Sequence, residues 1–219
     1  MVTLPHSETR THGFDMVTVA PLSETVGALA IIVLAIIGLA GTVPAVMLAI
    51  ATIVIGAAIL MQGANAAGEY AELLALEEGG LVKPAAIGSG ITLEFLAGGT
   101  GVVLGILALL TPATLVLSAA ALIVFGGTLL LSSGATARAA TTQSEGATMS
   151  VVTRSLLREA AGVATGAQIM IGVGAIVLGI LALTGLHAEV LMLVGQLAVG
   201  AALLMVSAGS SIAGLWHNV

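Results

Sequence analysis

The sequence contains no cysteine and few charged or aromatic residues, and these shortages exclude several classes of protein. Without cysteine, the chain has no disulfides, no thiolate metal site and no cysteine nucleophile. Charged residues make up 7% of the 219 residues, against roughly 25% in a typical soluble domain. The 5 lysines and arginines are outnumbered by 11 acids, so the net charge of −6 argues against a nucleic-acid partner.

Long apolar runs take the place of the missing charges, since 58% of the residues are hydrophobic. Residues 91–135, ITLEFLAGGTGVVLGILALLTPATLVLSAAALIVFGGTLLLSSGA, form two such runs joined by Thr111 and Pro112. About 20 apolar residues in a helix, rising ~1.5 Å each, cross a hydrocarbon core of ~30 Å. This stretch therefore predicts a helical hairpin that crosses a lipid bilayer twice.

The same pattern occurs before and after this central stretch. When the central stretch is moved forward by 74 residues or back by 70, its small residues fall on small residues and one polar position falls on another. The sequence thus predicts an all-α polytopic membrane protein with six transmembrane helices, arranged as three repeated helical hairpins. The matched sets are Glu24, Glu94 and Gln168; Ala28, Gly98 and Gly172; and Gly56, Gly126 and Gly200.

Glycine and proline mark the three tight turns, which fall near Gly41 to Pro44, at Thr111 and Pro112, and at Gly185. Polar stretches separate the hairpins. The first continues the second span as a helix, and the second combines a loop rich in Ser, Thr, Ala and Gly with a short amphipathic helix lying along the headgroups. The predicted segments are a polar tail at 1–22, hairpins at 23–64, 91–134 and 165–212, connections at 65–90 and 135–164, and a tail at 213–219.

The positions of the basic residues predict the orientation. All five lie in the amino-terminal tail or in the two long connections, and none lies in a tight turn. Because cytoplasmic loops carry the excess of Lys and Arg, the long connections and both termini are predicted to be cytoplasmic. We therefore expect a multi-pass protein of the inner cell membrane.

Glu24, Glu94 and Gln168 are the sharpest candidates for a functional site. An ionisable residue inside a span is costly, and three polar groups at one depth would suit a proton or solute path. The alternative is structural, because each residue lies near the start of its helix, where the helix dipole and nearby water stabilise an acid. The sequence leaves both interpretations open.

Small residues spaced four apart form a second candidate set. They let helix backbones approach closely, either between hairpins or between subunits. Gln62 and Gln196 are expected to form hydrogen bonds across helices. The predicted helix-packing residues are Ala28, Gly98, Gly101, Gly105, Gly172, Ala175 and Gly179.

A charged surface is predicted on the cytoplasmic side. Glu69 and Glu72 follow the second span, and Arg154 and Arg158 lie four apart on the amphipathic helix. The two glutamates either pair with the two arginines of the same chain or bind a partner protein. No phosphate-binding loop, zinc motif or catalytic triad is present, and no cofactor is expected.

Two phrases carry a resemblance to a known family: VVLGILALLTPATLVLSAAALIVFGGTLLLSSGA and IVLGILALTGLHAEVLMLVGQLAVGAALLMVSAG. They resemble the HdeD-like family of small bacterial membrane proteins, over roughly residues 24 to 212. The resemblance implies an inner-membrane protein with six spans built as paired helices, linked in some bacteria to acid tolerance. It implies no particular site residues.

Two hypotheses of function follow. The first is a non-enzymatic integral membrane protein that lies in the lipid bilayer and forms a homo-oligomer or serves as an accessory subunit of a membrane complex. The second is a small proton or solute channel or transporter, with Glu24, Glu94 and Gln168 lining the path.

Overall fold

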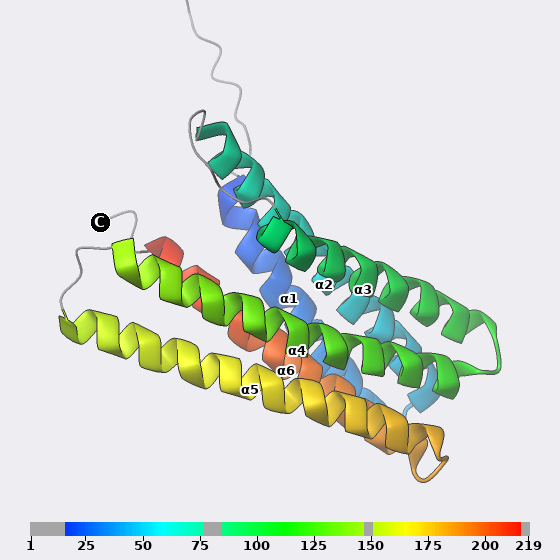
Figure 1. Cartoon of the computed structure of the whole chain (residues 1–219). Coiled ribbons are helices and arrows are strands. Elements are labelled where there is room, and N and C mark those ends of the chain that lie inside the picture. The colour runs from blue at the N-terminus through cyan, green and yellow to red at the C-terminus, as the bar shows by residue number, and fades with distance from the viewer. Residues whose placement is uncertain (1–15, 77–84, 147–150, 216–219) are drawn as a thin grey trace, which may run out of the picture.

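The computed structural model describes residues 16–76, 85–146 and 151–215, which form six helices joined in part by three short turns (Figure 1). The described chain is all-α, as predicted. The helices are α1 (Met16–Leu39), α2 (Pro44–Leu76), α3 (Ala85–Leu110), α4 (Thr114–Gly146), α5 (Val151–Leu183) and α6 (Ala188–Leu215).

Five of these helices contain a segment long and apolar enough to cross a membrane, as expected of a multi-pass membrane protein. In α1 the apolar part found among the described residues is shorter, Thr25–Leu39. The five segments are Pro44–Asn65, Leu93–Leu110, Thr114–Ser133, Thr165–Leu183 and Ala188–Ser207.

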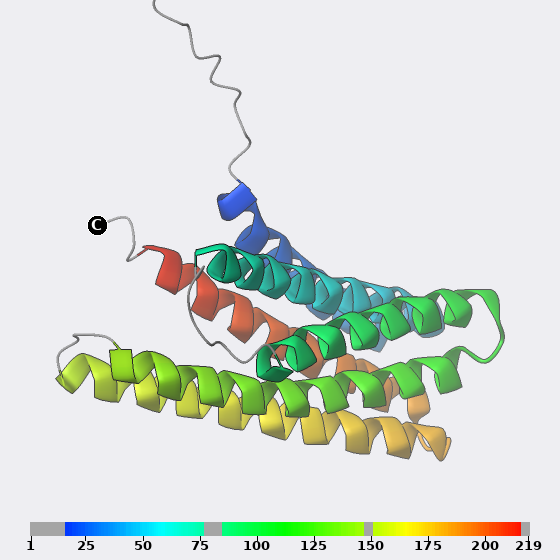
Figure 2. The ribbon, with the colours of Figure 1, turned by 45° about the horizontal axis from the view of Figure 1, so that its top comes forward.

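The three short turns lie together at one end of the bundle (Figures 1 and 2). The first and third share one backbone path, because Gly41 and Gly185 have φ of 86° and 84° while Val43 and His187 have φ of 43° and 46°. Positive φ is readily adopted by glycine and is unfavourable for a β-branched residue such as Val43. The predicted breaks are confirmed at all three turns, since α1, α3 and α5 end at Leu39, Leu110 and Leu183 before the next helix begins.

The long connections differ from their predicted form. The sequence predicts a loop in the first part of 135–164. This prediction is wrong, because α4 stays helical through Gly146. The separate amphipathic helix is also wrong, since these residues are the first turns of α5, which runs unbroken from Val151 to Leu183. The segment ATARAATT contains four alanines and no proline, and alanine has the highest helix propensity. The propensity of alanine thus outweighs that of the serines and threonines.

Helix starts also fall earlier than predicted. The polar tail was expected to reach residue 22 and the first connection residue 90, but α1 begins at Met16 and α3 at Ala85. The predicted helical continuation of the second span is confirmed as far as Leu76, where the described part of α2 ends.

Each even-numbered helix packs against the odd-numbered helix of another hairpin: α2 on α3, α4 on α5 and α6 on α1. We call these three contacts the α2–α3, α4–α5 and α6–α1 seams. The helices α2, α4 and α6 also contact one another, whereas α1, α3 and α5 make no mutual contact among the described residues. The six helices therefore close into a ring, with the even-numbered helices at the centre and the odd-numbered ones outside.

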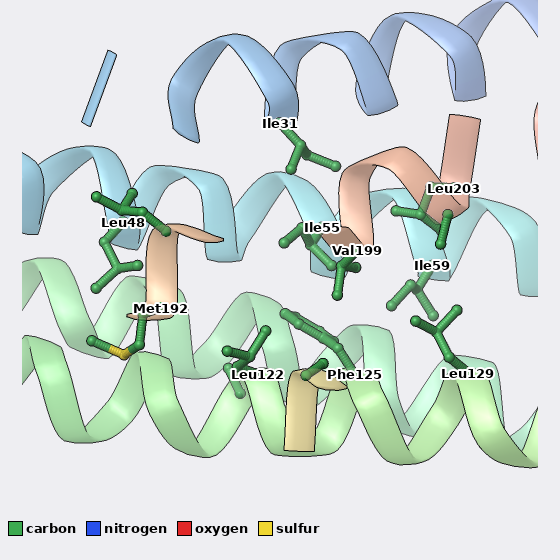
Figure 3. Close-up of a cluster of buried hydrophobic side chains, with 14 of the residues drawn as sticks. Ile31, Leu48, Ile55, Ile59, Leu122, Phe125, Leu129, Met192, Val199 and Leu203 are labelled. Atoms are coloured by element: carbon green, nitrogen blue, oxygen red, sulfur yellow. The ribbon is translucent and has the colours of Figure 1, made fainter. Parts of the chain in front are cut away.

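Buried side chains from α2, α4 and α6 fill the centre in successive layers (Figure 3). One layer holds Ile55, Phe125 and Val199, and the next holds Ile59, Leu129 and Leu203. The members of each layer are 70 and 74 residues apart, the spacing seen in the sequence. The outer helices expose large apolar side chains, as expected for surfaces in contact with lipid.

Candidate functional site

The α2–α3 seam is a contact between two backbones. A methyl group placed on Gly98 would lie 2.7 Å from the carbonyl oxygen of Gly56 and 2.7 Å from the backbone nitrogen of Leu60. One placed on Gly56 would lie 2.6 Å from the backbone nitrogen of Val102. Glycine at both positions removes the atoms that would hold the helices apart, so dispersion contacts form along the backbones.

The α4–α5 seam repeats this contact at equivalent residues. A methyl group on Gly126 would lie 2.6 Å from the carbonyl oxygen of Gly172, and one on Gly172 would lie 2.8 Å from that of Gly126. Further along, Gly179 packs against Ile123 as Gly105 packs against Ile53 in the α2–α3 seam.

The α6–α1 seam is built differently. A methyl group on Gly200 would meet the side chain of Ile31 at 2.9 Å and that of Ile32 at 3.3 Å, and its three nearest atoms are all side-chain atoms. Ala28, which stands where the other seams have Gly98 and Gly172, is fully buried. Side chains therefore separate the two backbones at this seam.

The predicted helix-packing residues thus lie at contacts between helices of one chain. Gly101 makes room for an aromatic ring, since a methyl group there would lie 2.4 Å from Cε1 and from Cζ of Phe125. Ala175, the equivalent of Gly101 on α5, is buried beside Gly126. These residues make their contacts inside the bundle, with neighbouring helices of the same chain.

The structure does not bring Glu24, Glu94 and Gln168 together, because they lie on α1, α3 and α5, which make no mutual contact among the described residues. Glu94 is half-buried and lies over Gly63 of α2, where an added methyl group would be 3.1 Å from its Cβ and 3.5 Å from its Oε2. Gln168 is half-buried on α5. The side chain of Glu24 lies outside those that the structure describes.

A buried polar cluster joins α2 and α6. The Nε2 of Gln196 donates to the backbone oxygen of Leu48 at 3.0 Å and to Oγ1 of Thr52 at 2.8 Å. The Thr52 hydroxyl donates to the same Leu48 oxygen at 2.8 Å. The prediction that Gln196 bonds across helices is confirmed, whereas Thr52 was missed. The signal that would have found it is register, since Thr52 and Gln196 are equivalent positions of their hairpins.

The charged residues predicted to form a cytoplasmic surface lie on two helices, Glu69 and Glu72 on α2 and Arg154 and Arg158 on α5. Their side chains are outside those described, so their pairing stays a prediction. Among the described residues no group of three or more His, Asp or Glu side chains lies close enough to hold a metal ion.

Comparisons with protein-family models, with curated proteins and with solved structures found no match to this chain. The resemblance to the HdeD-like family therefore stays a prediction.

Proposed function

We propose that the chain is a non-enzymatic protein of the inner membrane, which crosses the lipid six times as three copies of one helix pair with both termini in the cytoplasm. Equivalent turns, the recurring Gly-on-Gly contacts and the 70- and 74-residue register of the buried layers support the triplication. The absence of basic residues from the three turns supports the orientation.

Within the membrane, the protein self-associates or serves as an accessory subunit of a larger complex. The outward face of α5 carries this proposal. Gly166 and Gly174 lie about two turns apart, and a methyl group on either would meet nothing within 4 Å. Between them Met170 is 78% exposed. Open glycines beside a flexible apolar side chain let another helix approach closely in lipid.

The mass of the assembly in mild detergent tests this proposal. We expect a mass above that of the 21.4 kDa chain, and a lower mass when Gly174→Ile places a branched side chain on the α5 face. Gly99→Ile is the matched control, because Gly99 is an equally open glycine on another outer helix, α3. A wild-type chain that is monomeric and brings down no other protein would contradict the proposal.

The alternative is a small proton or solute channel or transporter, with Glu24, Glu94 and Gln168 lining its path. One observation favours it: a carboxylate, that of Glu94, is packed half-buried over Gly63 in the α2–α3 seam. The packed apolar layers on the bundle axis oppose it, because such a path would have to follow the seams.

Flux in liposomes separates the two functions. Under the leading proposal, the wild-type protein and Glu94→Gln both leave a proton or solute gradient intact. A wild-type flux abolished by Glu94→Gln would support the channel. Glu189→Gln is the control, since Glu189 lies in the first turn of α6, beside a short turn, whereas Glu94 lies at the start of the apolar segment of α3, far from the short turn that follows that helix.

A further inference from the structure

Two polar atoms in the middle of the bundle have no hydrogen-bond partner among the described residues: Oε1 of Gln196 and Oγ of Ser118. Both residues are 1% exposed and lie in membrane-spanning segments, on α6 and α4. An unsatisfied buried polar group costs about 1–3 kcal/mol, and such groups in folded proteins are usually satisfied by an ordered water.

The hydrogen bonds around Gln196 fix which atom of its amide is free. The single hydroxyl proton of Thr52 goes to the Leu48 oxygen, so Oγ1 of Thr52 must accept from Gln196. The Leu48 oxygen can only accept as well. Both contacts therefore require the NH2 group of Gln196, and its Oε1 is left as an acceptor that needs a donor.

Ser118 supplies a donor on α4, a helix that contacts α6. The two helices touch here, because a methyl group on Gly195 would lie 2.5 Å from Cδ2 of Leu122. Ser118 is one turn before Leu122, a rise of about 6 Å along α4. Because neither Oγ of Ser118 nor Oε1 of Gln196 has a hydrogen-bond partner in the described part of the chain, the two atoms do not bond directly, and a link between them needs one small molecule that bonds to both.

We propose that a single water molecule binds between Ser118 of α4 and Gln196 of α6. The Ser118 hydroxyl donates to the water, and the water donates to Oε1 of Gln196, so that both unpartnered atoms are satisfied. The apolar layer of Ile55, Phe125 and Val199 lies just beyond the cluster, away from the short turns. This water is therefore a fixed part of the three-helix contact, and the site is separate from Glu94 and its equivalents.

A double-mutant cycle in the full-length protein tests the shared site. Ser118→Ala and Gln196→Met are made singly and together, and thermal unfolding is followed by circular dichroism in mild detergent. We expect each single change to lower Tm by about 2–4 °C. Because either change removes the same bridge, the double variant should lose clearly less than the sum of the two. Additive losses would overturn the proposal.

Thr128→Val combined with Gln196→Met is the matched control. Thr128 is buried on the same helix as Ser118, but its hydroxyl already donates to the Val124 oxygen at 2.9 Å. The effects of these two changes should add.

Water itself is detected by NMR of the wild-type protein in lipid bilayers, with the side-chain amides of glutamine labelled. The Gln196 amide, assigned by its loss in Gln196→Met, should show contact with a bound water that disappears in Ser118→Ala. A wild-type spectrum without this contact would overturn the proposal even if the cycle is not additive, because the two side chains would then bond directly. A contact unchanged in Ser118→Ala would also overturn it.

Discussion

The α2–α3 and α4–α5 seams are closed by backbone against backbone, whereas the α6–α1 seam is closed by side chains. The three occupy equivalent places in the ring, and the even-numbered helix brings a glycine to each: Gly56, Gly126 and Gly200. The difference comes from the odd-numbered helix, where α1 has Ala28 and Ile31 in the places of Gly98 and Gly101. In this bundle, backbone contact occurs at the two seams that have glycine on both helices, and not at the seam where only the even-numbered helix has one.

A consequence for stability follows from this comparison. In the two glycine seams a methyl group on Gly56, Gly98, Gly126 or Gly172 would meet a backbone atom at 2.6–2.8 Å, so these positions tolerate little added volume. In the α6–α1 seam a methyl group on Gly200 would meet side-chain atoms only, at 2.9 Å or more, and this seam joins the first helix to the last. Of the three seams it has the fewest contacts, and we expect it to open before the other two, since local opening begins where contacts are few.

The largest effect is expected from Gly98→Ala, which places a methyl group 2.7 Å from two backbone atoms of α2. Backbone cannot shift without separating the helices, so the variant should lose about 3 kcal/mol of unfolding free energy. Gly172→Ala should lose a similar amount in the α4–α5 seam. Chemical unfolding in mild detergent, followed by circular dichroism, measures both.

Gly99→Ala is the control for this prediction. Gly99 is the next residue on α3 and faces open space. Alanine there should leave stability unchanged or raise it by up to about 1 kcal/mol, because glycine is the poorer helix former. If Gly98→Ala were as stable as Gly99→Ala, the seam would not be closed by backbone contact.

A smaller effect is expected from Gly101→Ala, where the added methyl group meets the ring of Phe125 at 2.4 Å. The ring is fully buried, so the variant should lose about 2 kcal/mol. Phe125→Leu alone leaves a small cavity, but together with Gly101→Ala it removes the clash. The double variant should therefore be more stable than the sum of the two losses predicts, as unfolding curves of all three variants would show. Strict additivity would mean that the two side chains do not share this space.

Much of the fold follows from patterns that are readable in the sequence. The turns at Gly41 and Gly185, the apolar runs and the register of 70 and 74 residues depend on local chemistry and on which positions must be small. The helical form of residues 135–146 differs from the loop that the serines and threonines predict, because the alanines among them favour a helix.

The seams could not be told from subunit contacts by sequence alone. The glycines at 98 and 172 indicate that another helix approaches closely, but the sequence does not say whether that helix belongs to the same chain or to another copy. The packing of α2 on α3 decides this, and it depends on long-range contacts. The buried cluster could not be predicted for the same reason. Nothing at position 52 alone marks Thr52 as a hydrogen-bond partner, and only the fold brings Gln196 beside it.

The smallest effect is expected from Gly200→Ala in the α6–α1 seam. The added methyl group would lie 2.9 Å from Cγ2 of Ile31 and 3.2 Å from its Cβ, farther than the 2.7 Å from backbone atoms at Gly98. The smaller displacement needed here costs about 1 kcal/mol, and the gain in helix propensity from glycine to alanine is of the same size, so the net change should be near zero. The free energies of unfolding of Gly200→Ala and Gly98→Ala, measured side by side, test the difference between the seams most directly. A loss at Gly200 equal to that at Gly98 would show that all three seams are equally rigid.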